Sequence, residues 1–379
     1  MWVGFWALSL PEENRYLMKI IFHHPLPLNP NATSASGIRP LRMLEAFKSL
    51  GYQVDVVAGY SAERKVAINE IKKNIKSGVK YDFIYSESST MPTVLTDPHH
   101  LPLHPLLDFG FFRFCKKNNI KTGLFYRDIY WLFDSYSKNL SWFKSTIAKL
   151  AYKYELYFYK RYLEKLYLPS LEMGKYVPIV PSEKFIALPP GHDTVLSTNS
   201  PSEQKDQLKL FYVGGMSDHY QMHTLFQVIN ERDDVEFTLC TREIEWQAVK
   251  DEYPDLTKNI KIVHQSGEEM QALMLASDAV SIFVKPQEYR EFAAPVKLYE
   301  YLGNRKPIIA SQGTLAGKFV TDNKIGWSLP YAETALHELF DQLKANSKLL
   351  INVQAQMNSV AQNHTWQARA KQVVKDLTQ

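Results

Sequence analysis

Short apolar segments alternate with amphipathic stretches along most of this chain, and the alternation restricts the fold more than any other feature. Residues 19–23 are a short apolar run, residues 41–50 carry apolar side chains at helical spacing, and residues 54–58 are apolar again. Residues 82–86 and 122–126 continue the series. A strand, a helix and a strand in succession are typical of parallel sheets with crossover helices, so we expect such a sheet here.

A second series of the same kind occupies the other half of the chain. Its expected strands and helices are residues 210–213, 222–230, 236–240, 260–264, 270–276 and 279–284. The two series are separated by Pro-Pro-Gly at 189–191 and by a polar stretch, 194–207, with the composition of a linker. The sequence therefore predicts an α/β protein with two facing, Rossmann-like, doubly wound domains. Ligands of such sheets bind beyond the carboxyl ends of the strands, so we expect the site between the domains.

Composition argues against several classes of protein. Cys115 and Cys240 are far apart, so neither a disulfide framework nor a zinc cluster is expected, and a reducing cytoplasm fits. No apolar run approaches the roughly 20 residues that a membrane-spanning helix needs. Residues 1–17 are rich in apolar residues but lack the basic start and the cleavage site of a signal peptide, so we interpret them as an extension, disordered or added by an upstream start. The eleven histidines show no HExxH spacing.

The net charge of +4 conceals an asymmetry between the halves. Residues 18–190 contain 24 Lys and Arg against 14 Asp and Glu, a net charge of +10, whereas residues 191–379 contain 19 against 24, a net charge of −5. A basic first half favours an anionic partner, and we expect an acidic membrane surface rather than nucleic acid. Residues 140–168 combine Tyr and Leu at helical spacing with several lysines. This segment is either a core helix with lysines in water or an interfacial helix on acidic lipid, and the apolar loop 101–107 adds to the second alternative.

The segment 295–311 carries the strongest chemical signal in the chain. Lys297 and Glu300 are three residues apart on an expected helix, so they share one face. Such a pair suits a nucleoside diphosphate, because the ammonium neutralises phosphate and the carboxylate accepts hydrogen bonds from ribose hydroxyls. The alternative is a pair of solvated surface residues. Lys306 lies beyond the helix and is expected to be structural.

Several segments, in order, resemble the GT-B glycosyltransferases, specifically the large retaining group called family 4. The resemblance is carried by residues 37–40, 188–193, 211–215, 295–302 and 306–311. It implies a GT-B fold in which the second domain binds a nucleotide-activated sugar, the first binds the acceptor, and the last helix crosses back to the first domain. The expected divisions are an extension at 1–17, an acceptor domain at 18–190, a hinge at 191–207, a nucleotide-sugar domain at 208–360 and a returning helix at 361–379.

One position departs from the pattern of this family. The family has a second glutamate eight positions before Glu300, usually facing the donor sugar. Phe292 stands at that position here, and the nearest acid is Glu291. The donor sugar and the choice between retention and inversion therefore stay open.

Other candidates for the donor site follow strands of the second half. Gly214-Gly215 comes directly after a strand, where glycines let the backbone approach a phosphate, although Gly-Gly is also a common turn. Arg242 could add a cation to the leaving diphosphate or could pair with a neighbouring glutamate at the surface. The polar loop after residues 279–284 is either solvated or in contact with the sugar and its phosphates through Glu288, Tyr289 and Arg290.

Candidates for the acceptor site lie in the first half. Asp128 follows an expected strand and could activate the acceptor hydroxyl, or could cap a helix. Arg127 and Trp131 could bind an anionic or sugar acceptor. Gly37 permits close backbone approach between the domains, and Arg39 could contact phosphate.

These observations predict a hexosyltransferase-like glycosyltransferase of polysaccharide or glycolipid assembly. It would move a sugar from a nucleoside diphosphate, with UDP or GDP favoured, to a saccharide or lipid-linked acceptor. Lys297 would stabilise the departing diphosphate. The sequence contains no Asp-x-Asp, so we expect no metal and no other cofactor. We expect a cytoplasmic protein that can lie peripherally on the inner face of the membrane. A nucleotide-sugar epimerase of the same architecture and a catalytically inactive nucleotide-sugar-binding subunit stay open as alternatives.

Overall fold

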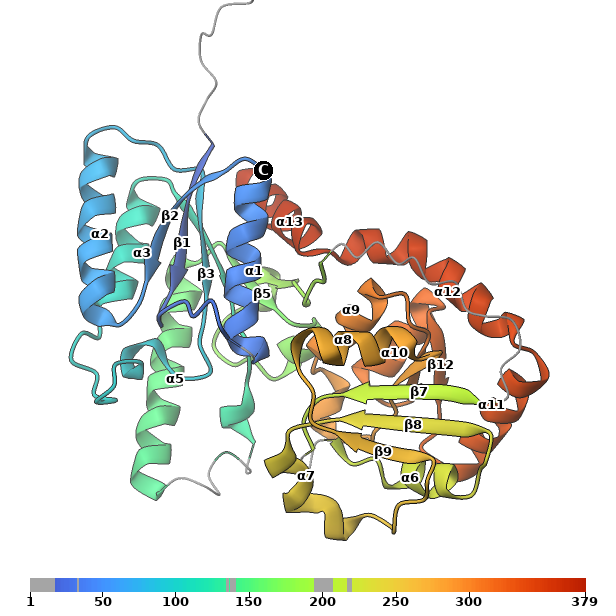
Figure 1. The fold of residues 1–379 in the computed structure, drawn as a ribbon. Coiled ribbons are helices and arrows are strands. Elements are labelled where there is room, and N and C mark those ends of the chain that lie inside the picture. The colour runs from blue at the N-terminus through green and yellow to red at the C-terminus, as the bar shows by residue number, and fades with distance from the viewer. Residues whose placement is uncertain (1–17, 33, 134–135, 137–140, 194–206, 217–219) are drawn as a thin grey trace, which may run out of the picture.

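A computed structural model of the chain contains two α/β domains joined at their edges (Figure 1). The structure describes every residue except 1–17, 33, 134–135, 137–140, 194–206 and 217–219. The expected extension at 1–17 and most of the expected hinge at 191–207 therefore lie outside the described residues. Every strand pairing between named strands in the described part of the chain is parallel, which confirms the predicted fold class.

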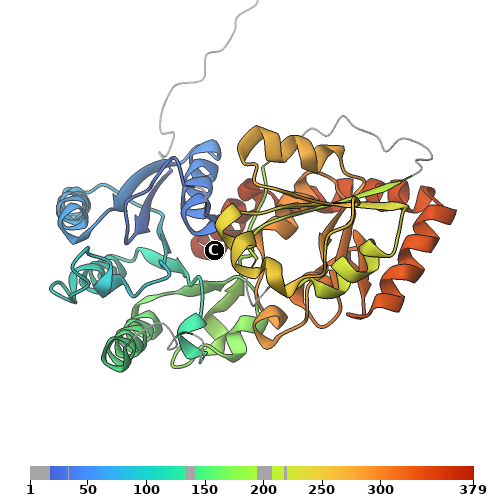
Figure 2. The same ribbon diagram turned by 60° about the horizontal axis from the view of Figure 1, so that its bottom comes forward.

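The first domain is built on a sheet with the strand order β2-β1-β3-β4-β5-β6. Its strands are β1 (Lys19–His24), β2 (Gln53–Ala58), β3 (Phe83–Glu87), β4 (Lys121–Phe125), β5 (Lys165–Leu168) and β6 (Phe185–Ala187). Its α-helices are α1 (Ala35–Ser49), α2 (Ser61–Lys76), α3 (Leu107–Lys117) and α5 (Trp142–Tyr162), and its 3-10 helices are η1 (Thr93–Leu95), η2 (Tyr130–Leu132), η3 (Glu172–Lys175) and η4 (Ser182–Lys184). Helices α2, α3 and α5 cover one face of the sheet, and α1 covers the other (Figure 2). A sheet covered on both faces explains why β3 is buried at every position.

The periodicity of residues 140–168 indicates a single helix, but the described part of this segment, 141–168, contains two elements. Helix α5 begins after Ser141, whose hydroxyl accepts a hydrogen bond from the Lys144 backbone N–H, and the chain leaves helical geometry at Leu163. Residues 165–168 then pair between β4 and β6 as β5. The helical period of apolar residues does not reveal this boundary, because a strand buried on both faces is apolar at successive positions and so also matches a helical spacing.

The second domain repeats the design with the strand order β12-β11-β10-β7-β8-β9. Its strands are β7 (Leu208–Val213), β8 (Val235–Cys240), β9 (Ile260–Val263), β10 (Ala279–Ile282), β11 (Ile308–Ser311) and β12 (Gly326–Leu329). Its helices are α6 (His223–Asn230), α7 (Glu243–Val249), η6 (Lys250–Glu252), α8 (Gly267–Ala276), η7 (Glu288–Glu291), α9 (Val296–Gly303), α10 (Leu315–Asn323), α11 (Glu333–Ala345) and α12 (Lys348–Ala361). Helices α6, α7 and α11 pack on one face, and α8, α9, α10 and α12 pack on the other.

The chain crosses between the domains near His192 and again near His364, and the two crossings run side by side. The His192 N–H donates to the His364 carbonyl at 3.0 Å, and the Trp366 N–H donates to the His192 carbonyl at 3.1 Å. Gly191 makes this approach feasible, since a Cβ there would lie 2.7 Å from the Trp366 nitrogen. The return crossing passes through η8 (Gln362–His364).

The C-terminal helix α13 (Trp366–Thr378) packs against the first domain next to α1 (Figure 1). Trp366, Ala370, Val373 and Leu377 are buried in one cluster with side chains of β1 and α1. The glycine at position 123 of β4 leaves room for the helix, because a Cβ there would lie 3.0 Å from Leu377 Cδ1. None of the helices in the described part of the chain is both apolar enough and long enough to cross a bilayer.

Candidate active site

Lys297 lies in the first turn of α9, beside the turn that follows β7. Gly214 in that turn has φ +146°, and a Cβ at this position would overlap the lysine ammonium, so the backbone conformation and the close approach both require glycine. The Lys297 Nζ donates a hydrogen bond to the Tyr212 hydroxyl at 2.6 Å. It also lies 3.9 Å from the centroid of the Tyr212 ring and 4.1 Å from that of Tyr220. The structure thus brings together the glycine turn and the lysine that the sequence singled out separately.

The Lys297 ammonium is buried without a counter-ion among the described residues. The residue is 8% exposed, and no carboxylate in the described part of the chain lies within 4.0 Å of its Nζ. Burial lowers the pKa of this lysine well below its ordinary value, and repulsion by Arg290 lowers the pKa further. The carboxylates of Glu300 and Glu245 raise this pKa in part, and a bound anion would favour the charged form of the lysine further.

Arg290 places a second cation next to Lys297. It is 5% exposed, and its guanidinium carbon lies 3.7 Å from the centroid of the same Tyr220 ring. Two cations on one ring, both removed from solvent, concentrate positive potential where β7 ends and α9 begins. The helix end adds to this potential, because N–H groups of the first turn of α9 point toward the same end.

Glu300 lies one turn further along α9 and is half-buried. Burial raises the pKa of its carboxyl, and the positive charge of Lys297 opposes that rise. No described residue donates a hydrogen bond to the Glu300 carboxylate. Its acceptor atoms can therefore receive hydroxyl groups of a ligand. Lys306 has a structural role, since its Nζ donates to the carbonyls of Leu275 and Ser277 at 2.6 and 2.7 Å.

Arg242 occupies the surface position that the sequence left as an alternative. It is 78% exposed and forms an ion pair with Glu245 one turn into α7. Glu245 also accepts a hydrogen bond from the Met216 N–H at 3.1 Å, and the Gly215 carbonyl accepts one from the Tyr212 hydroxyl at 2.9 Å. Gly215 and Glu245 therefore hold the turn after β7 in place, while Arg242 has no contact with Lys297.

The loop around η7 joins the second domain to the first. The Tyr289 hydroxyl donates to Asp128 Oδ2 at 3.0 Å, and the Tyr130 N–H donates to Asp128 Oδ1 at 2.9 Å. The Asp128 carboxylate therefore binds the first N–H of η2, whose N-cap is Ile129, and also holds the interdomain contact. Burial raises the pKa of its carboxyl. Glu288, from the same loop, is exposed.

Phe292 is an interdomain anchor, which explains the absence of an acid at this position. It is 1% exposed, and its ring lies 5.8 Å from that of Phe133, 4.9 Å from that of Tyr176 and 5.2 Å from that of Tyr289. Its carbonyl accepts a hydrogen bond from the Ser170 hydroxyl of the first domain at 2.7 Å. A carboxylate here would be buried among aromatic rings, and the neighbouring Glu291 is exposed to solvent.

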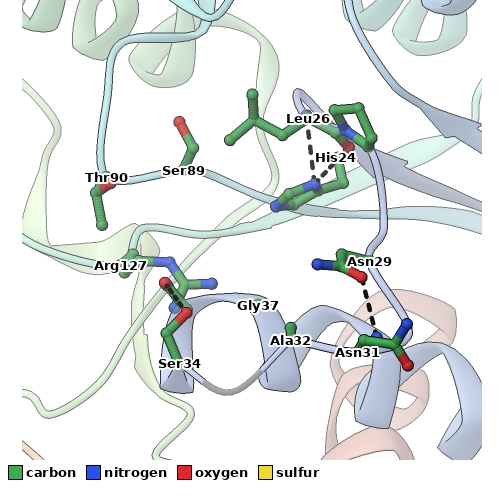
Figure 3. A pocket seen from close by; sticks show the side chains of 12 residues that line it. His24, Leu26, Asn29, Asn31, Ala32, Ser34, Gly37, Ser89, Thr90 and Arg127 are labelled. Atoms are coloured by element: carbon green, nitrogen blue, oxygen red, sulfur yellow. Dashed lines mark hydrogen bonds between the residues drawn. The ribbon is translucent and has the colours of Figure 1, made fainter. Parts of the chain in front are cut away.

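A pocket of about 340 Å³ opens in the first domain at the carboxyl ends of β1, β3 and β4 (Figure 3). It is lined by His24, Leu26, Pro27, Asn29, Asn31, Ala32, Ser34, Ser36, Gly37, Ser89, Thr90 and Arg127. The Arg127 guanidinium extends into it and is held from behind by the Glu87 carboxylate and the Ser88 carbonyl, each 3.3 Å away. Six of the twelve lining residues carry a hydroxyl or a side-chain amide, and Arg127 adds a cation, so the pocket suits a hydroxylated ligand, with or without an anionic group.

Three of the acceptor candidates take positions that differ from the expectation. Trp131 is 2% exposed, stacks on Tyr152 and donates to the Tyr126 hydroxyl at 2.8 Å, so it is a core residue. Arg39 is 3% exposed and binds the carbonyls that precede the crossing, together with the Glu87 carboxylate, so it is also internal. Gly37 does line the pocket, but its close approach is to Ala32 of the same domain rather than to the second domain.

Comparison with solved structures shows which fold this is. HepE from Anabaena in complex with UDP superimposes with a TM-score of 0.65 at 14% identity, over 95% of this chain and 100% of that one. Sucrose-phosphate synthase from Thermosynechococcus elongatus gives 0.64 at 14% identity over 94% and 98%. WaaG, a glycosyltransferase involved in lipopolysaccharide biosynthesis, gives 0.57 at 13% identity over 95% and 99%. The chain has the GT-B fold.

No protein-family model matches the sequence, and no curated protein matches it. At 13–14% identity the likeness establishes the GT-B architecture and leaves the chemistry to the residues described above. Among the described residues, no group of three or more His, Cys, Asp or Glu side chains is placed to hold a metal ion.

A series of contacts links Lys297 in the second domain to the pocket in the first. Arg127, which lines the pocket, is followed by Asp128, which accepts from Tyr289 of the second domain. The neighbouring Arg290 shares the Tyr220 ring with Lys297. The anion site and the pocket therefore lie on either side of one interdomain contact.

Sequence reasoning missed His24 and the two tyrosines of the anion site. His24 lines the pocket, and burial lowers its pKa to about 4, so its imidazole is neutral at pH 7. Its Nδ1 lies 2.9 Å from the Leu26 carbonyl and 3.3 Å from the Leu26 nitrogen, two contacts that call for opposite tautomers, so no tautomer is assigned. The sequence signal that could have identified His24 is its position at the end of an expected strand, because ligands of parallel sheets bind beyond the carboxyl ends of the strands. Tyr212 and Tyr220 gave no such signal, because only the fold places them against Lys297.

Proposed function

We propose that this protein is a glycosyltransferase that moves a sugar from a nucleoside diphosphate to a hydroxyl of an acceptor bound in the first domain. The observation that carries the proposal is the buried Lys297 ammonium, which lies beside the glycine turn with a second cation on the same tyrosine ring and no carboxylate partner among the described residues. A diphosphate supplies the charge that such a site lacks. The GT-B neighbours include HepE solved with UDP and with UDP-glucose, which supports a nucleotide-sugar donor.

In this proposal each group has a defined task. The donor diphosphate binds Lys297 and Arg290, and Glu300 accepts hydrogen bonds from the ribose hydroxyls. As the bond from the sugar to the diphosphate breaks, negative charge grows on the leaving phosphate, and the two cations stabilise it more strongly than they stabilise the ground state. Lysine and arginine thereby take the part that a divalent cation plays in metal-dependent transferases, and UDP or GDP is the expected nucleotide.

The acceptor hydroxyl would enter from the pocket in the first domain. We propose that Arg127 and the polar side chains of the lining bind a saccharide or a lipid-linked saccharide there, in polysaccharide or glycolipid assembly. We propose that Asp128, which follows Arg127 and contacts Tyr289 of the second domain, orients or deprotonates the acceptor hydroxyl. Phe292 supplies no carboxylate, so no stereochemical outcome is assigned.

The proposed donor site is tested by calorimetric titration of the protein with UDP, GDP, ADP and CMP and with the corresponding nucleotide sugars. Binding of at least one nucleoside diphosphate is expected, together with its loss in K297M. Failure of all of them to bind would remove the proposal.

The transfer half is tested by measuring nucleotide release with and without a panel of saccharides and lipid extracts. Release that depends on the acceptor supports a transferase. Epimer formation without an acceptor would assign the epimerase alternative, and binding without any turnover would assign the inactive subunit.

A further inference from the structure

Helix α5 exposes an apolar stripe to solvent along its length. Phe143, Leu150 and Tyr157 are spaced seven residues apart, so they share one face, and they are 65%, 61% and 60% exposed. Trp142 at the start of the helix is 81% exposed, and Ile147 is 38% exposed. In Figure 1 the N-terminal part of α5, in green, extends beyond the sheet and the other helices of the first domain. The opposite face of the helix packs in the core of the domain.

A second apolar segment lies against α5. The loop between η1 and α3 is exposed from residue 98 to residue 106, and Leu101, Leu103 and Leu106 in it are 54%, 60% and 60% exposed. The Tyr154 hydroxyl of α5 donates to the Pro105 carbonyl of this loop at 3.1 Å. The helix and the loop thus form one surface, which we call the α5 surface. Single exposed apolar residues are common on soluble proteins, but here several are grouped on adjoining elements.

The charge of the α5 surface comes from the helix and is positive. Residues 142–162 contain Lys144, Lys149, Lys153, Lys160 and Arg161 and a single acid, Glu155. Glu155 is buried, and burial raises the pKa of its carboxyl to about 8, so it adds no exposed negative charge. Among the described residues, none of the five basic side chains forms an ion pair with a carboxylate. A second copy of the chain would bring like charges together, which disfavours self-association through this face.

We propose that the α5 surface docks the protein on an anionic lipid bilayer. Trp, Phe and Tyr side chains beside lysines match the headgroup boundary, where rings enter the acyl edge while ammonium groups remain at the phosphates. The mode is peripheral, with the apolar stripe of α5 lying along the membrane plane.

The docking would place the pocket of the first domain close to the membrane. The buried face of α5 contacts the loop that lines the pocket, since the Tyr152 hydroxyl donates to the Thr90 carbonyl at 2.7 Å and the Glu155 carboxylate accepts from the Thr93 N–H. This consequence, unlike the docking itself, rests on the proposed function: an acceptor carried by a lipid would reach the pocket without leaving the bilayer.

The experiment is sedimentation of the full chain with vesicles of neutral phosphatidylcholine alone or mixed with anionic phosphatidylglycerol. We expect binding to the mixed vesicles, with an affinity that falls as salt rises from 0.05 to about 0.5 M because the Debye length shortens. Trp142 should shift its emission to the blue on binding, and the shift should disappear in W142F. Absence of binding to the mixed vesicles at low salt would overturn the proposal, as would equal binding to both vesicle types.

Matched variants separate the two contributions to binding. F143S/L150S/Y157S and K153E/K160E should each reduce the vesicle affinity about tenfold or more. The controls are I244S, which removes an even more exposed apolar residue of the second domain, and K73E/K76E, which reverses two exposed lysines of α2. Equal losses in the controls would refute the assignment to α5. Thermal unfolding checks that the variants fold, and light scattering measures their oligomeric state. If the parent were a dimer that F143S/L150S/Y157S alone dissociated, the face would be assigned to self-association instead. UDP binding tests the donor site separately, so failure of docking leaves the proposed function standing.

Discussion

Replacement of Lys297 by methionine should weaken nucleotide binding without weakening the fold. Methionine has a similar length and volume but carries no charge, so the main change is the loss of the ammonium. In the ligand-free protein that ammonium is 8% exposed and has no carboxylate partner among the described residues. Its one hydrogen-bond partner, the Tyr212 hydroxyl, still donates to the Gly215 carbonyl after the change. We therefore expect K297M to be at least as stable as the parent.

The affinity for a nucleoside diphosphate should change in the opposite direction. A hydrogen bond to a charged group contributes about 1.5–3 kcal/mol, and each 1.36 kcal/mol corresponds to a factor of ten, so the loss is about 10- to 150-fold. Isothermal titration with UDP measures it, and K258M, which changes an exposed lysine of the same domain, is the matched control. An affinity within twofold of the parent would show that the diphosphate binds elsewhere.

The pH dependence of unfolding gives an independent check on the same residue. Because the folded-state pKa of Lys297 lies below the unfolded value near 10.5, the unfolded chain binds more protons between these two values. The free energy of unfolding of the parent should therefore rise relative to K297M as the pH increases through that window. Urea titrations at several pH values measure the difference. A difference that falls with pH, or a loss of more than about 2 kcal/mol in K297M at pH 7, would show that the charge is compensated inside the fold.

Three further variants test the remaining parts of the site. E300Q should weaken UDP binding about tenfold, because an amide loses the charge-assisted contact, and the exposed control E291Q should not; equal affinities in titration would contradict the ribose assignment. F292A should lower the free energy of unfolding in urea by about 3–5 kcal/mol, whereas F143A, at an exposed site, should change it by about 0.5 kcal/mol or less, and a small effect of F292A would exclude an anchoring role. Y289F removes the donor to Asp128, so the folded-state pKa of that carboxyl, already above 3.8, should rise further. Stability falls as the pH rises from 3.8 through this raised pKa, and urea titrations should show a larger fall in Y289F than in the parent; an identical pH profile would argue against the contact.

Much of the fold followed from local patterns. The alternation of apolar runs with amphipathic stretches placed most strands and helices near their observed positions, and the all-parallel sheets follow from that order. One exception was the segment 140–168, where one apolar periodicity covered both α5 and β5. Helices α2, α3, α7 and α10 were not predicted either. Periodicity cannot separate a buried strand from the end of a helix, because both present apolar side chains at several spacings.

The candidate site was predictable only where its chemistry is concentrated in one segment. Lys297 and Glu300 stood out because a cation and a carboxylate lie one turn apart on a short helix. Trp131 and Arg39 were proposed for the acceptor site from their position after or near a strand. Both are buried, Trp131 by stacking on Tyr152 of α5 and Arg39 by binding the Leu188 carbonyl. A strand end predicts which side chains can reach a ligand, but packing decides which of them do.

The sequence by itself determined the two αβ series and the helix that bears the lysine and glutamate, because the spacing of apolar residues over one or two turns sets the type of each element. Tertiary structure alone decided that Lys297 would be buried with Arg290 on one tyrosine ring, and that Tyr289 would bind Asp128, 161 positions away. It also showed that Phe292, which stands where the family has an acid, packs against aromatic rings of the first domain as an interdomain anchor. The physical reason is that burial and charge pairing depend on which strand ends lie next to one another in the folded protein. Contacts between residues so far apart in the chain do not affect the local spacing of apolar residues.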